Sequence, residues 1–263
     1  MKPMKPMLCT PLSIDDAHKL VANEGYIVEE KFDGVRAYIE DGKLFDRRGA
    51  DITKRFPEFT GIERLNGFDG ELVVAKGQFS DVASRMHLRD KFQIGVLSKR
   101  SPVTFMAFDY FAESDEPLSQ RKKFLSREVA KAAERWLKDA EFSVASPNNL
   151  EEMWDRIIEE RKEGVVIKRL DSTYQFGKRS PEWVKMKAWT EATATFTKLA
   201  EHPKGVRLET ADGRSVNVNG AQAQDVKKRF EKAGKVTCEV QFLPQKDSDA
   251  WRFPSFRGIR AEE

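Results

Sequence analysis

The feature that most constrains the fold of this chain is a change of pattern near residue 189. Before that point, short apolar segments typical of strands are interspersed with two long amphipathic segments, residues 119–137 and 149–158. Beyond it lie only short strand-like segments and one helical stretch, residues 221–233, which Gly234 ends. This arrangement predicts an α+β protein with two domains, residues 1–189 and 190–263, and the length of 263 residues favours the same number.

Strands of the first domain are indicated by apolar runs with turn residues between them. Asp41-Gly42 separates two such runs and predicts a hairpin. The other predicted strands are 26–28, 70–74, 103–111, 165–167 and 183–186.

Several short strands and one helix within about 70 residues suit a small β-barrel such as an OB-fold. Residues 190–263 hold 13 Lys and Arg against 11 Asp and Glu, a difference of +2, so the barrel is not a strongly basic module. The whole chain has a formal charge of +3, which identifies no partner by itself.

Composition excludes several classes of protein. Hydrophobic residues make up 40% of the chain, enough for a packed core, so a disordered chain is not expected. Cys9 and Cys238 lie far apart, which argues against a disulfide framework or a zinc site and favours a reducing cytoplasm. No segment approaches the roughly 18 apolar residues that a membrane-spanning helix needs, so we expect a soluble protein.

The segment most suggestive of chemistry is residues 29–36, Glu-Glu-Lys-Phe-Asp-Gly-Val-Arg. A lysine becomes a nucleophile when its environment promotes the neutral amine, and Lys31 follows a predicted strand and precedes Gly34, which allows close approach of a ligand. Arg36 has the planar fork that binds phosphate or carboxylate. Taken alone, the same residues also suit an ordinary charged turn.

Other charged segments are individually modest. Glu71 begins a predicted strand, and Phe108 lies in an apolar strand where an aromatic residue usually serves the core. Glu163 and Lys168 bracket the buried run Gly-Val-Val-Ile. Lys185 and Lys187 lie two apart in a strand and would therefore share a face, a costly arrangement unless an anion lies between them.

In their order and spacing, however, these segments resemble the covalent nucleotidyltransferases, a superfamily of DNA ligases, RNA ligases and mRNA capping enzymes. Residues 178–187 and Arg252-Phe253-Pro254 are most similar to the ATP-dependent DNA ligases, and the resemblance extends from about residue 26 to 260. It implies an adenylation domain of antiparallel sheets with helices, followed by an OB-fold. It also implies ATP and Mg²⁺ (or Mn²⁺) as cofactors, nicked double-stranded DNA as substrate and a monomeric enzyme.

The resemblance assigns the chemistry to five residues. Lys31 would attack the α-phosphate of ATP and carry AMP, Asp33 would act near the nucleophile and the 3′-hydroxyl of the nick, and Arg36 would bind ribose or the nick phosphate. Lys185 and Lys187 would hold the α-phosphate.

Nucleotide and metal contacts are implied in the same way. Glu29 would recognise the adenine amino group, Phe108 would stack on the base, and Glu71 would contact the ribose. Glu163, together with Glu71, would bind the divalent metal. Four arginines complete the set: Arg179 at the α-phosphate, Arg47 at AMP and the 5′-phosphate, and Arg252 and Arg260 at pyrophosphate or DNA.

The end of the chain departs from the family pattern, because Arg260 is followed by Ala261-Glu262-Glu263 and not by Asp-Lys. Pyrophosphate contacts would then fall to Arg252 or Arg260. Only about 25 residues precede the first motif, so we expect the two domains alone to embrace the nick.

Two other functions fit parts of the pattern. An RNA ligase or a GTP-using capping enzyme shares the nucleophile segment, although Glu29 and the Arg-Phe-Pro segment argue against the latter. A protein that binds nucleic acid without catalysis would use the barrel alone. Transfer of label from ATP or GTP to the protein, followed by nicked DNA or RNA, separates these alternatives.

Overall fold

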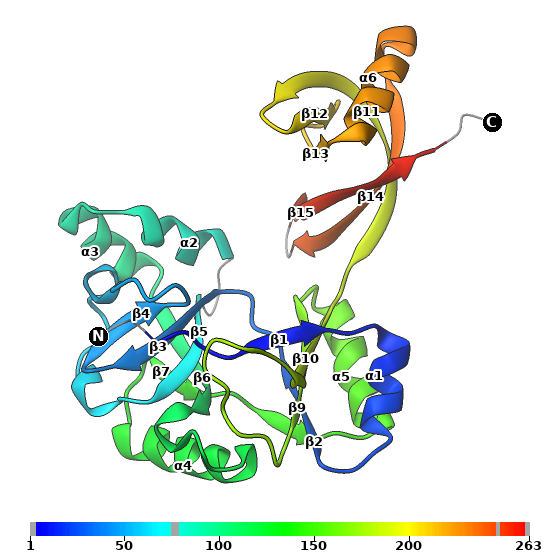
Figure 1. Cartoon of the computed structure of the whole chain (residues 1–263). Helices are drawn as coiled ribbons and strands as arrows, with labels where there is room; N and C mark the ends of the chain where they lie inside the picture. The colour runs from blue at the N-terminus through cyan, green and yellow to red at the C-terminus, as the bar shows by residue number, and fades with distance from the viewer. Residues whose placement is uncertain (1–3, 75–78, 246–247, 261–263) are drawn as a thin grey trace. The chain divides into compact units, whose positions relative to one another are not determined.

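The computed structural model describes residues 4–74, 79–245 and 248–260, and Figure 1 shows its elements. The chain divides into two compact units. The first comprises Met1–Ile158 and Glu163–Met186, and the second comprises Glu159–Lys162 and Lys187–Glu263. Residues 261–263 of the final motif lie outside the described part of the chain.

Two five-stranded sheets form the centre of the first unit. The first sheet, sheet A, has the order β1 (Leu8–Pro11), β10 (Arg179–Lys187), β9 (Gly164–Arg169), β2 (Tyr26–Glu30) and β8 (Phe142–Val144). The second, sheet B, has the order β4 (Lys43–Asp46), β3 (Val35–Glu40), β5 (Phe68–Val74), β6 (Val103–Tyr110) and β7 (Leu137–Asp139). The sheets are mixed and not purely antiparallel as expected, because β1 pairs parallel to β10 and β6 pairs parallel to β7.

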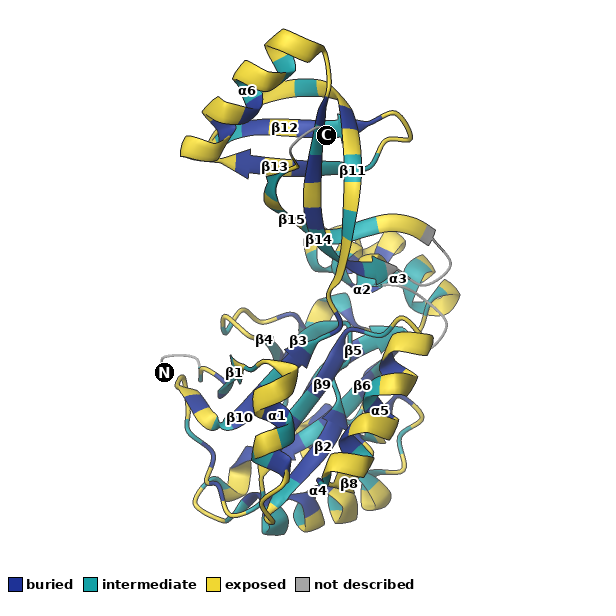
Figure 2. Cartoon of the chain, turned by 90° about the vertical axis from the view of Figure 1, so that its right-hand side faces the viewer, coloured by how far each residue is buried: buried dark blue, intermediate teal, exposed yellow. Residues whose placement is uncertain are grey.

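Five helices accompany these sheets: α1 (Ile14–Val21), α2 (Phe79–His87), α3 (Lys91–Arg100), α4 (Leu118–Ala132) and α5 (Pro147–Glu159). Short 3₁₀ turns lie at Thr53–Arg55, Ile62–Arg64 and Phe111–Glu113. Helices α1 and α5 lie on the same side of sheet A, and their outer faces are exposed while the strands behind them are buried (Figure 2). Each helix therefore buries one stripe and leaves the other in solvent.

The helix predicted over residues 119–137 is shorter in the structure. It ends at Ala132 because Ala133 takes the left-handed conformation, with φ of 53°, and donates its N–H to Val129 O. Trp136 and Leu137 nevertheless bury their side chains in the same core as Leu125 of the helix. Periodic apolar residues thus marked the core correctly but not the end of the helix.

Helices α2 and α3 were not predicted from the sequence. They connect β5 to β6 and begin soon after Val74. Helix α2 is anchored by Arg85, whose fully buried guanidinium donates to both carboxylate oxygens of Glu58 at 2.6 and 2.7 Å. Val82 of the same helix packs into the core of sheet B.

The described residues of the second unit form one antiparallel sheet with a single helix. Its strands are β11 (Thr190–His202), β12 (Gly205–Thr210), β13 (Ser215–Asn219), β14 (Val236–Gln245) and β15 (Ser248–Ile259), in the order β13-β12-β11-β14-β15. Strands β13 and β15 also lie against each other, which brings the two ends of this order together, so the sheet curls into a nearly closed barrel. Such a barrel is consistent with the predicted OB-fold.

Helix α6 (Ala221–Ala233) has the predicted bounds. Gly234 ends it with φ of 67° and donates its N–H to Phe230 O at 2.7 Å, a cap that a residue with a side chain would form only under strain. Ala223 and Val226 of the helix pack on the barrel core, which includes Phe196 and Leu208.

Candidate active site

Lys31 lies where the chain passes from one sheet to the other. Strand β2 of sheet A ends at Glu30, and β3 of sheet B begins at Val35. The backbone N–H of Lys31 donates to Gly164 O at 2.8 Å, and the Lys31 ammonium donates to Glu163 Oε2 at 2.6 Å. The predicted nucleophile and the predicted metal ligand, 132 positions apart in sequence, are therefore in direct contact.

The charge state of Lys31 depends on its neighbours. Burial by itself lowers the pKa of this ammonium, but the carboxylates of Glu163 and Glu71 outweigh that effect and the net pKa of Lys31 is raised. The side chain is consequently held in the protonated form. To act as a nucleophile, Lys31 has to lose its proton, and anything that offsets the two carboxylates promotes that loss.

Glu71 lies opposite Arg36 in the pairing of β3 with β5. Burial raises the pKa of Glu71 to about 7; the cations of Lys31 and Arg36 oppose this effect, and the carboxylates of Glu163 and Asp69 add to it. Glu71 thus changes charge near neutral pH, a property frequently found at functional sites.

At Gly34 the backbone lies very close to strand β5. A Cβ atom at this position would lie 2.1 Å from Leu72 O and 2.9 Å from the Glu71 Cγ. Only glycine lets the segment after Lys31 pack so tightly on β5, which explains physically the glycine that the sequence places there.

Arg36 binds a buried carboxylate. Its Nε and one terminal nitrogen donate to the two oxygens of Asp69 at 2.7 and 2.6 Å, and Asp69 is fully buried. Tyr174 also donates its hydroxyl to Asp69, at 2.5 Å. The Arg36 guanidinium lies 4.7 Å from the centroid of the Phe108 ring, so the predicted base-stacking residue and the predicted phosphate ligand are neighbours.

Glu29 belongs to a buried network of charges. Its two carboxylate oxygens form ion pairs with Lys122 and, at 2.6 Å, with Lys168; the Lys122 contact lacks the alignment of a hydrogen bond. Lys168 also donates to Phe108 O at 3.2 Å. Burial lowers the pKa of Lys168, and Lys122 lowers it further, against the effect of Glu29.

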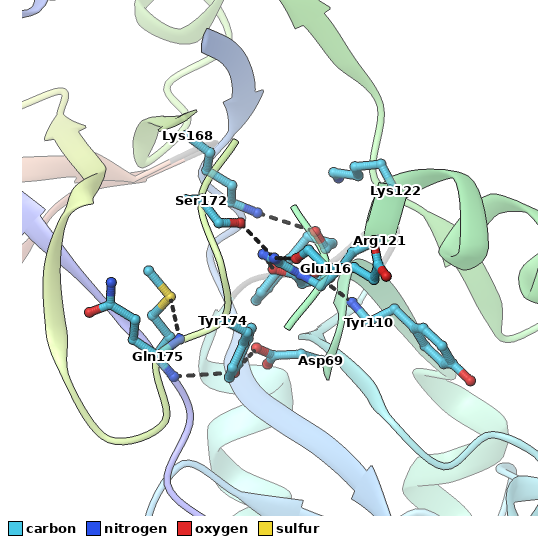
Figure 3. A network of polar contacts seen from close by, with 12 residues as sticks. Asp69, Tyr110, Glu116, Arg121, Lys122, Lys168, Ser172, Tyr174 and Gln175 are labelled. Atoms are coloured by element: carbon cyan, nitrogen blue, oxygen red, sulfur yellow. Dashed lines mark hydrogen bonds and ion pairs between the residues drawn. The ribbon is translucent and has the colours of Figure 1, made fainter. Parts of the chain in front are cut away.

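A fully buried ion pair, Arg121 with Asp109, lies close enough to this network to affect the pKa of Lys168, and Figure 3 shows Arg121 with Lys122 and Lys168. Arg121 donates to both oxygens of Asp109, at 2.8 and 3.0 Å, and to the carbonyl oxygens of Glu116 and Ser172, both at 2.7 Å. Arg121 holds the pKa of Asp109 below its usual range, in spite of the burial that works in the opposite direction. Counting both groups, three cations (Lys122, Lys168, Arg121) face two anions (Glu29, Asp109), an excess of one positive charge.

Cys9, on β1, marks the point where several cations converge. Burial raises the pKa of its thiol, while Arg36, Lys168, Lys31 and Lys185 all lower it. Cationic side chains from separate sequence segments thus lie close enough to Cys9 to affect the pKa of its thiol.

The remaining predicted basic residues have diverse environments. Arg179 donates to Cys9 O, and Arg47 is exposed on a turn that Asp46 closes by accepting N–H groups from Arg48 and Ala50. The structure describes no contact that brings either guanidinium to Lys31. Asp33 lies partly exposed beside Gly34.

Lys187, Arg252 and Arg260 belong to the second unit. The Lys187 ammonium lies 5.2 Å from the Trp189 ring and 5.4 Å from the Phe253 ring. Arg252 also lies over Phe253, and Arg260 donates to the Thr193 hydroxyl at 2.9 Å. Lys187 and Arg252 thus lie at the same ring, Phe253, whereas Arg260 contacts Thr193 of β11.

Several participants were not singled out by sequence reasoning. Asp69 lies two residues before Glu71 in the sequence, and Arg121 and Lys122 lie in the amphipathic segment 119–137. Their sequence context carries no signal, because each becomes notable only through a partner far along the chain. Lys168 closes the strand led by Glu163, and its pairing with Glu29 is not evident from the sequence.

The side chains of the site could hold a hard divalent cation only if a bound ligand supplied further oxygen atoms to the metal. No group of three or more His, Cys, Asp or Glu side chains suited to a metal exists among the described residues. Glu163 and Glu71, both near Lys31, provide two carboxylates, which is what Mg²⁺ uses when waters and substrate phosphates complete its shell.

A buried amine that contacts Glu163 and feels the charge of Glu71, at the junction of two sheets, is an arrangement suited to a nucleotidyltransferase. The chain belongs to the family of ATP-dependent DNA ligase domains, which residues 6–187 match. It is 30% identical over 209 residues to a DNA ligase of Sulfolobus acidocaldarius and 31% identical over 211 residues to one of Thermococcus fumicolans. These matches cover 70% and 72% of this chain but only 34% and 37% of the relatives, so the chain spans about a third of their length.

Solved structures show the same fold over nearly the whole chain. A structure from the Lig E DNA ligases is similar with a TM-score of 0.73 and 22% identity, covering 97% of this chain and 99% of that one. The Chlorella virus DNA ligase-adenylate is similar with a TM-score of 0.57 and 19% identity, covering 100% of both chains. At these identities the likeness concerns the fold alone. Among the described residues, no helix is long and apolar enough to cross a membrane.

Proposed function

We propose that this chain is an ATP-dependent DNA ligase that seals nicks in duplex DNA through an AMP carried on Lys31. The observation that carries the proposal is the position of Lys31, in contact with Glu163, near Glu71, and shortly before the tightly packed Gly34. Membership of the ligase family supports the same reaction. The domain boundary near residue 189, the monomeric state and the cytoplasmic location are part of this proposal.

The reaction has three steps. The Lys31 amine attacks the α-phosphorus of ATP; a nitrogen–phosphorus bond forms, the bond to pyrophosphate breaks, and pyrophosphate leaves. An oxygen of the 5′-phosphate at the nick then attacks the same phosphorus, which returns the electron pair to Lys31. Finally the 3′-hydroxyl attacks the activated 5′-phosphate, a phosphodiester bond forms, and AMP leaves.

The residues of the site have corresponding roles in this proposal. Phe108 provides a flat face for the base, and a carboxylate oxygen of Glu29, which lies between Lys122 and Lys168, accepts a hydrogen bond from the adenine amino group. Lys185, Lys187 and Arg179 neutralise the α-phosphate, and Arg47 binds AMP and the 5′-phosphate. Asp33 acts on the 3′-hydroxyl.

Three further contacts complete the proposal. Arg36, fixed by Asp69 and by the Met7 carbonyl oxygen, presents the N–H groups of its other terminal nitrogen to ribose or to the nick phosphate. Arg252 and Arg260 contact pyrophosphate or DNA. Glu163 and Glu71 would hold Mg²⁺ (or Mn²⁺), which supplies positive charge at the phosphates and beside the amine.

Mass spectrometry of the protein after incubation with ATP and Mg²⁺ tests the proposal. We expect one added AMP on Lys31, its absence from Lys31→Ala, and its discharge by nicked DNA with release of sealed product. Discharge by nicked RNA alone, or an adduct from GTP alone, would favour the RNA ligase or capping enzyme instead. An adduct that survives in Lys31→Ala contradicts the assignment of the nucleophile.

A further inference from the structure

The solvent-exposed face of helix α3 carries large apolar side chains, whereas the exposed face of an ordinary surface helix is polar. Phe92 and Val96, one turn apart, are 80% and 46% exposed, and Phe92 is the most exposed large apolar side chain of the described residues. Lys99 and Arg100 continue the same face at the spacing of seven and eight residues from Phe92. Ile94 points to the opposite side and is buried. Apolar residues at this spacing usually face a core; here they face solvent.

The surroundings of this face are basic. Arg89, Lys91, Lys99 and Arg100 are all exposed, and none of them forms an ion pair with a residue that the structure describes. The only carboxylate between Arg89 and Arg100 is Asp90, which caps the helix by accepting from Gln93 N at 2.9 Å. The α3 face therefore presents uncompensated positive charge around an apolar centre.

The place of α3 in the unit connects it to the candidate active site. Leu72 of β5 contacts Gly34, and β5 ends two residues later at Val74, about 7 Å further along the strand. Val74 pairs with Val103, the first residue of β6, so α2 and α3 emerge between them at the end of sheet B that carries the segment after Lys31. Figure 1 shows the two helices together at one end of the unit, away from α4.

We propose that the α3 face, residues Arg89, Lys91, Phe92, Val96, Lys99 and Arg100, binds the duplex of the DNA substrate beside the nick. This inference rests on the proposed function, because a nick held at Lys31 brings a duplex to this end of sheet B. A duplex carries one negative charge per about 1.7 Å of its axis, so the cations bind phosphates and release counterions. Phe92 and Val96 pack against sugars and the wall of a groove, as apolar side chains of architectural proteins do.

Equilibrium binding of a labelled nicked duplex, without ATP and over a range of salt concentrations, tests the cations. The variant is Lys99→Gln with Arg100→Gln. Its matched control is Lys228→Gln with Arg229→Gln, a neighbouring exposed pair on α6 that gives the same change of net charge. We expect the slope of log K against log salt to fall by about 2 in the α3 variant, one for each phosphate that is no longer neutralised, and to stay unchanged in the control. An unchanged slope, or an equal fall in both variants, overturns the proposal.

Phe92→Ala tests the apolar centre, with Ile158→Ala as control because Ile158 is 50% exposed on α5. Phe92→Ala should weaken DNA binding at every salt concentration without changing the slope, whereas Ile158→Ala should have no effect. If Phe92→Ala leaves DNA binding intact and instead alters sedimentation, the face binds protein and the proposal is wrong.

The AMP adduct on Lys31, which forms without DNA, separates this inference from the proposed function. All the variants should form it as the unmodified protein does. Normal adduct formation with unaltered DNA binding would overturn the α3 face alone. An unmodified protein that forms no adduct would overturn the proposed function, and the binding measurements would still decide whether α3 binds DNA.

Discussion

The Lys31 ammonium and Glu163 Oε2 lie 2.6 Å apart, and this ion pair keeps the proposed nucleophile protonated. The carboxylate that stabilises the protonated amine is also the one proposed to bind the metal. Self-adenylation and metal binding are therefore linked through one contact, because a cation at Glu163 weakens the hold on the proton of Lys31.

Glu163→Gln removes the charge of that pair and keeps its shape. Since Glu163 raises the pKa of Lys31, adduct formation in the variant should reach its half-maximal rate at a lower pH than in the unmodified protein. The variant should also form less adduct at saturation, because it lacks a proposed metal ligand. The measurement is the pH profile of adduct formation with ATP and Mg²⁺, with Glu163→Asp as the charge-conserving control. A midpoint that stays in place or moves to higher pH would show that Glu163 does not set the charge of Lys31.

Glu71, with a pKa of about 7, predicts that Mg²⁺ dependence changes with pH. Only the ionised carboxylate binds the metal, so the Mg²⁺ concentration for half-maximal adduct formation should fall as pH rises through about 7, and Glu71→Gln should lose this dependence. Equal pH dependence in the two proteins would exclude Glu71 as a ligand.

Glu71 should also make the free energy of unfolding depend on pH. Its pKa in the folded protein lies above the unfolded value of 4.5, so the folded state binds more protons between these values and loses stability as pH rises from 4.5 to about 7. Denaturant unfolding at several pH values should show that loss in the unmodified protein and a smaller one in Glu71→Gln.

Gly34→Ala should misplace the proposed nucleophile. The added Cβ would lie 2.1 Å from Leu72 O, so the segment must shift, and a displacement of about 1 Å slows a positioned reaction on the order of 100-fold. Gly95→Ala on α3 is the control, because a Cβ there meets nothing within 4 Å. Adduct formation in single-turnover kinetics reports both, and a Gly34→Ala variant as fast as the control would contradict the close approach.

Arg121→Leu should be strongly destabilising. It leaves the fully buried Asp109 charge without its partner, which costs about 3–5 kcal/mol. Arg127→Ala removes the exposed pair with Glu128 and should cost about 0–1 kcal/mol. Urea unfolding of both variants measures the difference, and similar losses would show that the buried pair contributes little.

Trp189→Ala should make Lys187 more available to a phosphate. The ring now attracts the ammonium at 5.2 Å, an interaction of about 0.5–1 kcal/mol at exposed sites, so ATP affinity should rise about two- to fivefold. Calorimetry in the Lys31→Ala background avoids the adduct. Weaker ATP binding would show that Trp189 assists Lys187 and does not compete for it.

Sequence reasoning succeeded where local pattern determines structure. The α6 bounds follow from an apolar stripe and a terminal glycine, and the residues of the nucleophile segment are contiguous. It failed where long-range packing decides. Lys122 lies among the charged residues of helix α4, yet its side chain is buried because it forms an ion pair with Glu29 of sheet A.

The face of α3 is a second feature that local pattern does not predict. Phe92 and Val96 have the spacing of buried residues, yet they are exposed, and no local rule distinguishes an apolar stripe for a core from one for a ligand. The roles of Arg47, Arg252 and Arg260 stay predictions, because the partners assigned to them are ligands.

The four residues from Lys31 to Gly34 connect sheet A to sheet B, which are separate hydrogen-bonded sheets. This segment is held at both ends: the N–H of Lys31 donates to Gly164 O on sheet A, and Gly34 packs closely against Leu72 O on sheet B. A change in how the two sheets pack therefore alters the position of the reactive amine, so substitutions remote from the site that alter this packing should change the rate of adduct formation on Lys31.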